Sequence, residues 1–310
     1  MIHYRITVTP LGPRETELVS GTIWGHLAWA VRYLEGETAF SAWLEEQEHE
    51  PWLVSSYMPE GMLPKPILSP PLQAQEAPDF DSAERQKAFR KIKFIAEKTF
   101  LKLRSQMEAN ALVREMPYPP ATHRTGGRES RTAHNRINRI TGRTPDEGGL
   151  FFHDRILDPK ERRFQVFIQT PTPCKEKIKA LLDFIGSQGF GANASTGSGH
   201  MQFDVVEETE LFCATGNRAL TLSHGILTPN MTAPRYRLHT HHGKLGGHFA
   251  VGGFSPFKYP ILMVKPGSTF TPEGEGLFGQ LLTGVHHDPA LAGVRHHALH
   301  LPLFFTEATA

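Results

Sequence analysis

The chain has 310 residues and an almost balanced charge, with 33 Lys+Arg against 32 Asp+Glu and a formal net charge of +1. This length favours two domains. No stretch of about 18 apolar residues is present to cross a membrane, and the N-terminus lacks a signal-peptide pattern, so we expect a cytoplasmic protein. The two cysteines, Cys174 and Cys213, have no CxxC neighbour, which argues against a disulfide framework and a thiolate metal site.

The first predicted elements are a strand followed by a helix. Residues 2–8 alternate between apolar and polar side chains, which is the period of a half-buried strand. Residues 20–35 carry apolar side chains at helical spacing. We expect Ser20 to cap the start of this helix and Gly36 to cap its end.

A long insertion at about residues 37–148 follows, and its parts differ in charge. Residues 37–50 predict an acidic helix, and residues 82–106 predict a basic amphipathic helix. Residues 119–144 have no apolar period, six arginines and no lysine, which predicts an arm or loop outside the core. Residues 81–143 hold 15 Lys+Arg against 6 Asp+Glu, a local net charge of +9, and this indicates an anionic partner.

The chain then repeats strand and helix patterns. Residues 149–157 and 162–170 look like strands joined by a proline turn, which predicts a hairpin. A helix pattern over residues 174–186 and a strand pattern over residues 200–207 complete the unit. The order β-α-β-β-α-β is that of the ferredoxin-like, or RNA-recognition-type, fold.

From residue 209 the pattern changes to short strands interrupted by Gly and Pro. We therefore predict an α+β protein with two ferredoxin-like (RRM-like) modules. The first spans residues 1–208 and contains the insertion, and the second, mostly β with reduced helices, spans residues 209–310.

The segment GFGANASTGSGH, residues 189–200, is rich in glycine. Here a helix leads into the loop and the loop into a strand, whereas a dinucleotide-binding loop follows a strand and leads into a helix. Consecutive glycines let backbone N–H groups approach a phosphodiester, and Ser195 and Thr196 add hydroxyl donors. Taken alone, the segment is also compatible with a flexible connector.

The second candidate interface is the arginine-rich stretch that ends the insertion. Arginines three to five residues apart suit bidentate phosphate contacts and stacking on unpaired bases. His134 and Asn135 would donate to base edges or sugar hydroxyls. A solvated surface loop is the alternative, and the glycine-rich segment elsewhere in the chain favours RNA.

Four segments together resemble the RAMP proteins of type III CRISPR effectors, and most closely those of the type III-A Csm complex. They are SGTIWGHLAWAVRYLEG, HNRINRITGRTPDEGGLF, GFGANASTGSG and KLGGHFAVGGFSPFKYPILMVKPGSTF. The resemblance implies two ferredoxin-like modules with a glycine-rich loop and an inserted thumb-like arm. It also implies a non-catalytic subunit without cofactor or metal.

The same resemblance implies which partners and residues take part in binding. The subunit would hold the repeat-derived 5′ handle of the crRNA and dock on the large polymerase/cyclase-type subunit and on a backbone RAMP subunit. In the glycine-rich region, the expected RNA-binding residues are Gly186, Gly189, Phe190, Gly191, Asn193, Ser195, Thr196, Gly197 and Gly199. In the arm they are Arg124, Arg128, Arg131, His134, Asn135, Arg136, Ile137 and Arg139.

Two alternatives remain open. The first is an endoribonuclease that processes repeat RNA. It rests on His26 of the first helix, because related CRISPR endoribonucleases often carry a histidine there as a general acid or base. The equivalent subunit of a type III-B (Cmr) complex differs chiefly in its partners. The histidine clusters at 239–242, 286–287 and 296–300 lack the spacing of a zinc site, and we expect surface or interface imidazoles there.

Overall fold

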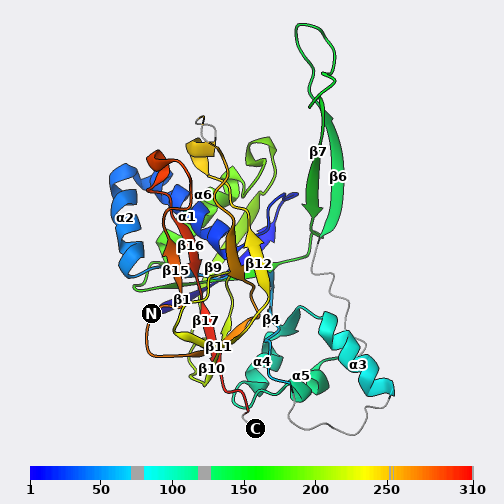
Figure 1. The fold of residues 1–310 in the computed structure, drawn as a ribbon, viewed down its shortest axis with the longest axis vertical. Coiled ribbons are helices and arrows are strands. Elements are labelled where there is room, and N and C mark those ends of the chain that lie inside the picture. The colour runs from blue at the N-terminus through cyan, green and yellow to red at the C-terminus, as the bar shows by residue number, and fades with distance from the viewer. Residues whose placement is uncertain (71–79, 118–126, 251–252, 254, 309–310) are drawn as a thin grey trace.

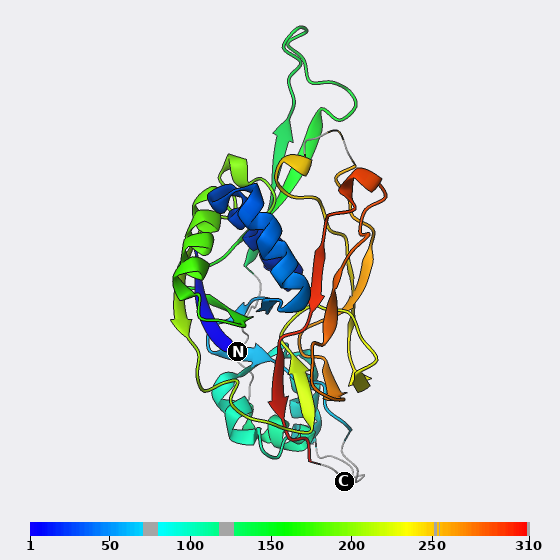
Figure 2. The ribbon, with the colours of Figure 1, turned by 90° about the vertical axis from the view of Figure 1, so that its left-hand side faces the viewer.

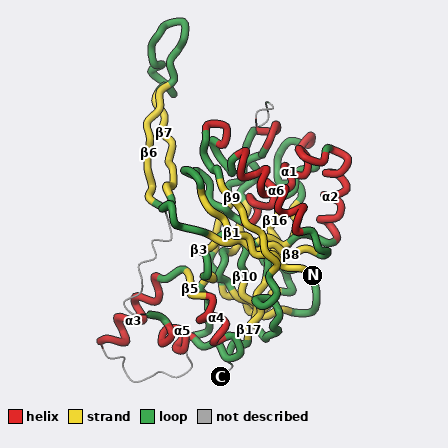
Figure 3. The backbone as a smooth tube through the Cα atoms, turned by 180° about the vertical axis from the view of Figure 1, so that it is seen from behind, coloured by secondary structure: helices red, strands yellow, loops and turns green. Residues whose placement is uncertain are grey.

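The computed structural model describes residues 1–70, 80–117, 127–250, 253 and 255–308. A body of helices and short sheets carries a long two-stranded arm and a small group of helices, which project from the same side (Figures 1 and 3). The described residues are α+β, as predicted, with several small antiparallel sheets. None of the helices among these residues is long and apolar enough to cross a membrane.

The largest sheet lies in the N-terminal half of the chain. Its order is β2 (Leu53–Val54), β8 (Phe164–Thr170), β1 (Ile2–Pro10) and β9 (Met201–Glu207), and β3 (Met58–Pro59) also pairs with β8. All of these pairings are antiparallel. The predicted strands at both ends of the first unit are confirmed as β1 and β9.

The predicted hairpin between residues 149–157 and 162–170 is wrong. Residues Leu150–Leu157 form β7, but β7 pairs with the preceding strand β6 (Arg128–Asn135), and β8 pairs with β1, β2 and β3. The β8 strand is almost entirely buried, whereas β7 is largely exposed, so the two have different surroundings. The strand beside β8 is instead β2, which has only two residues and lies inside the predicted insertion.

Two helices cover this sheet, α1 (Ser20–Glu35) and α6 (Lys175–Gln188). The α1 helix also contacts β16 (His296–Leu299), so it lies between the sheet and the C-terminal strands (Figure 2). Gly36 caps α1 with φ 87°, as predicted. Ser20 is inside the helix rather than at its cap, because its hydroxyl exchanges hydrogen bonds with the backbone of His224 at 3.0 and 3.1 Å.

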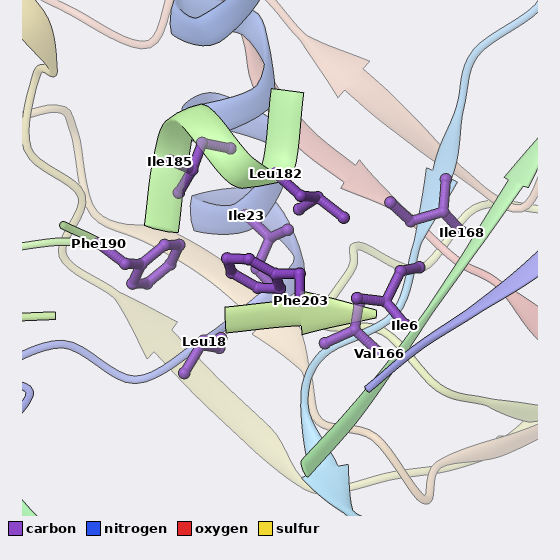
Figure 4. A pocket seen from close by; sticks show the side chains of 9 residues that line it. All are labelled: Ile6, Leu18, Ile23, Val166, Ile168, Leu182, Ile185, Phe190 and Phe203. Carbon is purple, nitrogen blue, oxygen red and sulfur yellow. The ribbon is translucent and has the colours of Figure 1, made fainter. Parts of the chain in front are cut away.

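The core between the sheet and the two helices is closely packed. Its cavity has a volume of about 10 Å³, which is room for about one water molecule, so the cavity cannot hold a small-molecule ligand. Nine apolar side chains line the cavity, and Phe190 of the glycine-rich segment is one of them (Figure 4).

The insertion forms one helix beside α1 and a separate helical group. The acidic helix is confirmed as α2 (Glu37–His49). The predicted helix over residues 82–106 is broken into α3 (Phe80–Lys91), the strand β5 (Phe94–Ala96) and α4 (Glu97–Leu103). The break arises because β5 pairs with β4 (Met62–Pro64) and buries Ile95 completely. A further helix, α5 (Ala109–Glu115), completes the group.

The C-terminal residues are mostly β, as predicted. One sheet has the order β11 (Met231–Arg235), β14 (Thr269–Pro272), β10 (Arg218–Thr221) and β17 (Pro302–Phe305). Two further pairs are β12 (Leu238–His241) with β13 (Ile261–Val264), and β15 (Gly279–Leu282) with β16. Short 3-10 turns lie at η2 (Gly247–Ala250) and η3 (Pro289–Leu291). The division of the chain at residue 208 stays a prediction.

The last histidine cluster is buried, so surface imidazoles were the wrong expectation there. His296, His297 and His300 are 3%, 0% and 0% exposed, because β16 lies against α1 and His300 contacts Thr221 and Ile226. Burial lowers the pKa of His297 and His300 to about 4, and these imidazoles are therefore neutral at pH 7. Among the described residues no three His, Cys, Asp or Glu side chains are grouped so that they could hold a metal ion.

Candidate nucleic-acid interface

The arm is a β-hairpin outside the core. Its strands β6 and β7 pair without interruption from Arg128 opposite Leu157 to Asn135 opposite Leu150. The hairpin and its tip extend well beyond the body (Figures 1 and 2). The prediction of an arm outside the core is confirmed, although it is a regular hairpin and not a loop, because residues 150–157 supply the second strand.

The tip of the arm has an ordered turn and exposed side chains. The Asn138 side-chain carbonyl accepts hydrogen bonds from the backbone N–H groups of Ile140 and Thr141, at 2.9 and 3.3 Å. The Ile140 side chain is 96% exposed, and Arg136, Ile137 and Arg139 are also exposed. The tip therefore presents cations and apolar side chains together to the solvent.

The two faces of the arm carry different side chains, since neighbours along a strand alternate and cross-strand partners share a face. One face holds a ring cluster of His134, Phe151 and His153, with ring centroids 4.6 to 5.5 Å apart. The opposite face holds Arg131, whose guanidinium lies 5.2 Å from the centre of the Phe152 ring.

The glycine-rich segment begins where α6 ends and returns into β9. Gly189, Gly191, Gly197 and Gly199 all have φ between 77° and 92°, a backbone region that side chains strongly disfavour. Asn193 also has a positive φ, 57°, a conformation that asparagine tolerates better than most residues.

Most of these glycines are required by close contact with the protein itself. A Cβ at Gly189 would lie 2.6 Å from the carbonyl oxygen of Ser198, and a Cβ at Gly199 would clash with the backbone of Phe190. At Gly191 it would clash with the side chain of Thr16, whereas at Gly197 it would meet nothing within 4 Å. The segment therefore folds back on itself and on the connection between β1 and α1.

Several backbone N–H groups of the segment already have acceptors in the protein. Phe190 donates to Gly199 O at 2.8 Å, and Gly199 donates to Pro13 O at 2.7 Å. Ala192 donates to the Thr16 hydroxyl at 2.9 Å. The N–H groups of Phe190, Ala192 and Gly199 are therefore not free to meet a phosphate.

The exposed part of the segment is the turn around η1 (Ala194–Thr196). Ser195, Thr196 and Gly197 are exposed, and the N–H groups of Asn193, Ala194 and Ser195 have no acceptor among the described residues. Any contact of this segment with a phosphodiester would therefore use the turn, while Gly186 and Phe190 are buried below it.

His26 supports the glycine-rich segment from below. Its Nε2 accepts a hydrogen bond from the Gly191 N–H at 3.1 Å, and its ring lies 4.3 Å from that of Phe190. Burial lowers the pKa of His26 to about 4. The imidazole is therefore neutral at pH 7, and its Nε2 is engaged by the Gly191 N–H.

The arm and the glycine-rich segment meet at the connection between β1 and α1. Asn193 Nδ2 lies 3.0 Å from His153 Nδ1 of the arm, so the ring cluster faces the turn. Glu15 contacts both parts: Arg155 Nε lies 3.2 Å and Ser198 Oγ lies 3.0 Å from its carboxylate. The two sequence motifs, more than forty residues apart, thus form one continuous surface.

The carboxylate of Glu15 is ionised at neutral pH. Burial alone would raise the pKa of Glu15, but hydrogen bonds from Asn193, Ser198 and Arg155 outweigh burial and hold the pKa below its ordinary value. The result is an anionic centre, 7% exposed, between the two halves of the candidate interface.

The root of the arm is also held by buried contacts. Arg14 and Ile156 exchange backbone hydrogen bonds at 2.8 and 3.1 Å. The Arg14 guanidinium pairs with Asp158 at 2.7 Å, and both side chains are buried. The segment between β1 and α1 therefore contacts the arm as far as the base of the hairpin.

The structure therefore sorts the predicted residues into groups. His134 and Arg128 lie on the arm face that carries the ring cluster, Arg131 and Asn135 lie on the opposite face, and Arg124 lies outside the described residues. Sequence reasoning missed Phe151, His153, Arg155 and Glu15. Residues 149–157 were predicted as a strand, but no local signal placed that strand on the arm.

No family model matches the chain, and no curated protein matches it by sequence. Solved structures do match its fold. A chain of the Csm1–Csm4 cassette in complex with pppApA matches with a TM-score of 0.61 and 17% identity, covering 100% of both chains. A chain of the same cassette in complex with cA4 matches with a TM-score of 0.60 and 17% identity, again covering 100% of both chains.

A chain of the Csm3–Csm4 subcomplex of the type III-A CRISPR-Cas interference complex matches with a TM-score of 0.59 and 15% identity, covering 97% of this chain and 99% of the other. Csm4 is the subunit that these assemblies have in common. The chain therefore has the fold of Csm4, and the resemblance to RAMP proteins is confirmed at the level of the fold.

Proposed function

We propose that the protein is the fourth Csm subunit of a type III-A CRISPR effector, which binds the 5′ handle of the crRNA without cleaving it. The observation that carries the proposal is the Csm4 fold over the full length of the chain. Csm4 is crystallised with Csm1 and with Csm3. By analogy, this chain docks on a large Csm1-type subunit and on a Csm3-type backbone subunit.

The proposal includes two ferredoxin-like modules. In the first, β1, α1, β2, β8, α6 and β9 follow one another in the order β-α-β-β-α-β, and the sheet order β9-β1-β8-β2 supports this assignment. The insertion then lies between the second and third strands, after residue 59, and not before the second strand. The C-terminal sheet β11-β14-β10-β17 would be the reduced second module.

RNA would bind where the arm meets the glycine-rich segment. The turn around η1 offers unengaged N–H groups and the Ser195 hydroxyl to phosphates, whereas the Thr196 hydroxyl donates to Asn193 O at 3.0 Å. The ring cluster on the arm offers flat surfaces to unpaired bases, which aromatic side chains bind by stacking. Arg136 and Arg139 at the tip would add phosphate contacts.

A salt titration of RNA affinity tests the proposal. The wild-type chain, alone and co-purified with its neighbouring subunits, is titrated with crRNA that carries its 5′ handle at several salt concentrations. Arg136→Ala/Arg139→Ala should weaken binding and reduce the slope of log K against log salt by about 1.4 if both arginines neutralise phosphates of a single strand.

The control for this titration removes the same charge elsewhere. Arg90→Ala/Lys91→Ala changes two exposed cations on α3, in the helical group away from the arm. This variant should leave the slope unchanged. An unchanged slope in the arm variant would remove the arm from the interface, and a wild-type protein that binds no handle RNA would refute the function.

The endoribonuclease alternative has a direct test. The chain is incubated with CRISPR repeat RNA, and the products are separated by gel electrophoresis. We expect no cleavage, because His26 Nε2 is engaged by the Gly191 N–H below the surface of the turn. Cleavage by the wild type that is lost in His26→Ala would replace the binding role by a processing activity.

A further inference from the structure

We propose that Glu15 is a positioning residue: it holds the arm at a set angle to the glycine-rich segment and so fixes the spacing of the two halves of the RNA interface. This inference rests on the proposed function. Glu15 belongs to neither half, since it lies in the connection between β1 and α1.

Glu15 contacts both halves. On the arm, its carboxylate accepts a hydrogen bond from Arg155 Nε at 3.2 Å, and it lies 3.6 Å from His153 Nδ1, which accepts from Asn193 Nδ2 instead. On the glycine-rich segment, it accepts hydrogen bonds from Ser198 Oγ at 3.0 Å and from Asn193 Nδ2. One carboxylate has two oxygens and enough acceptor sites for its three donors, Arg155, Asn193 and Ser198.

Each of the two residues beside Glu15 contacts only one half of the interface. Arg14 binds the root of the arm through Ile156 and Asp158. Thr16 accepts the Ala192 N–H of the glycine-rich segment at 2.9 Å. Of these three consecutive residues, Glu15 is therefore the one that contacts both halves.

Two attachments along a strand set its direction, whereas one attachment leaves it free to pivot. The Arg14 contacts hold β7 at positions 156 and 158, at the root. The Glu15 contact holds it at Arg155, three residues closer to the tip than Asp158, which is about 10 Å along an extended strand. Without Glu15, the arm would keep its root and the hydrogen bond between Asn193 and His153, but it would lose the ion pair at Arg155.

Charge distinguishes positioning from direct RNA contact. A carboxylate repels phosphates, so an ionised Glu15 at an RNA interface weakens binding unless it does something else there. Its partner Arg155 is correspondingly neutralised and is not available as a full phosphate contact. If Glu15 had only an electrostatic effect, its neutralisation would strengthen RNA binding.

The experiment measures the arm angle and the RNA affinity separately. Cys174 and Cys213 are replaced by serine, and spin labels are attached at Ile140→Cys on the tip and Ala180→Cys on the exposed side of α6. The distance distribution between the labels is measured by double electron–electron resonance. In Glu15→Gln the distribution should broaden, and the affinity for handle RNA should fall by roughly 3- to 10-fold.

Two further variants complete the design. Arg155→Met breaks the same contact from the exposed arm, where it does not threaten the fold, and should broaden the distribution likewise; the double variant should be no worse than Glu15→Gln alone. Glu161→Gln, which removes an exposed carboxylate from the turn after β7, is the control and should change neither readout.

An unchanged distance distribution in both Glu15→Gln and Arg155→Met would overturn the inference, and so would tighter RNA binding by Glu15→Gln at an unchanged arm angle. The outcome is separate from that of the proposed function. If the wild type binds no handle RNA, the function fails, while the label distances still decide whether Glu15 holds the arm.

Discussion

The arm and the glycine-rich segment differ in how they use their residues, although both motifs indicated RNA in the sequence. The arm exposes most of its side chains and is held to the body along one strand, at residues 153 to 158. The glycine-rich segment instead turns inward: Phe190 lies in the core, and three glycines fit closely against backbone or side chains of the protein.

The difference shows that glycines and arginines in a sequence predict different structural features. A glycine marks a place where something approaches the backbone closely, and here the approaching atoms at Gly189, Gly191 and Gly199 belong to the protein. A cluster of arginines without an apolar period marks exposure, because charged side chains are seldom buried without partners. Within residues 189–199, only the turn at residues 194–197 combines glycine with exposure.

The largest expected effect concerns two glycines of the segment with similar φ. Gly199→Ala should destabilise the protein by about 3 kcal/mol or more, because the new methyl group clashes with the buried backbone of Phe190. Gly197→Ala, with open space around it, should cost only the strain of a positive φ, about 1 kcal/mol. Urea unfolding of both variants measures the difference, and equal losses would contradict the close packing at residue 199.

A smaller effect is expected from the protonation of His26 beneath the segment. Its pKa is lowered to about 4 from 6.5, so below pH 6.5 the unfolded chain takes up a proton that the folded chain refuses. Stability is therefore complete above pH 6.5 and falls as the pH approaches 4. Between pH 8 and pH 5, His26 should account for up to about 2 kcal/mol of the loss.

The His26 effect is isolated by comparison with a variant. The free energy of unfolding of the wild type and of His26→Gln is measured in urea at pH 8 and pH 5. The buried histidines His297 and His300 contribute to both proteins and cancel in the difference. The same pH dependence in both proteins would show that the imidazole is not buried as the contact with Gly191 requires.

The smallest effect on stability is expected in the arm. Asn138→Ala removes the side-chain acceptor for two N–H groups of an exposed turn, so the global free energy of unfolding should change by less than about 1 kcal/mol. Hydrogen exchange of Ile140 and Thr141 should nevertheless become faster. A loss of several kcal/mol would mean that the arm is part of the cooperative core after all.

Much of the fold could be predicted from the sequence because its elements have strong local periods. The alternation of residues 2–8 marked β1, and the apolar stripe after Ser20 marked α1. The β2 strand has two residues and therefore no period to detect. The pairing of β7 with β6 could not be predicted either, since a strand pattern does not say which strand lies beside it.

The amino-acid sequence by itself determined the helices and strands with clear periods, the positive charge of the arm and the need for glycine after α6. These are local properties, fixed by side-chain spacing and by the conformations a residue can adopt. Only the tertiary structure decided that the arm is a hairpin, that most of the glycines face the protein, and that Glu15 joins the two motifs. Those features depend on contacts between residues far apart in the chain, and such contacts form only when the whole chain packs.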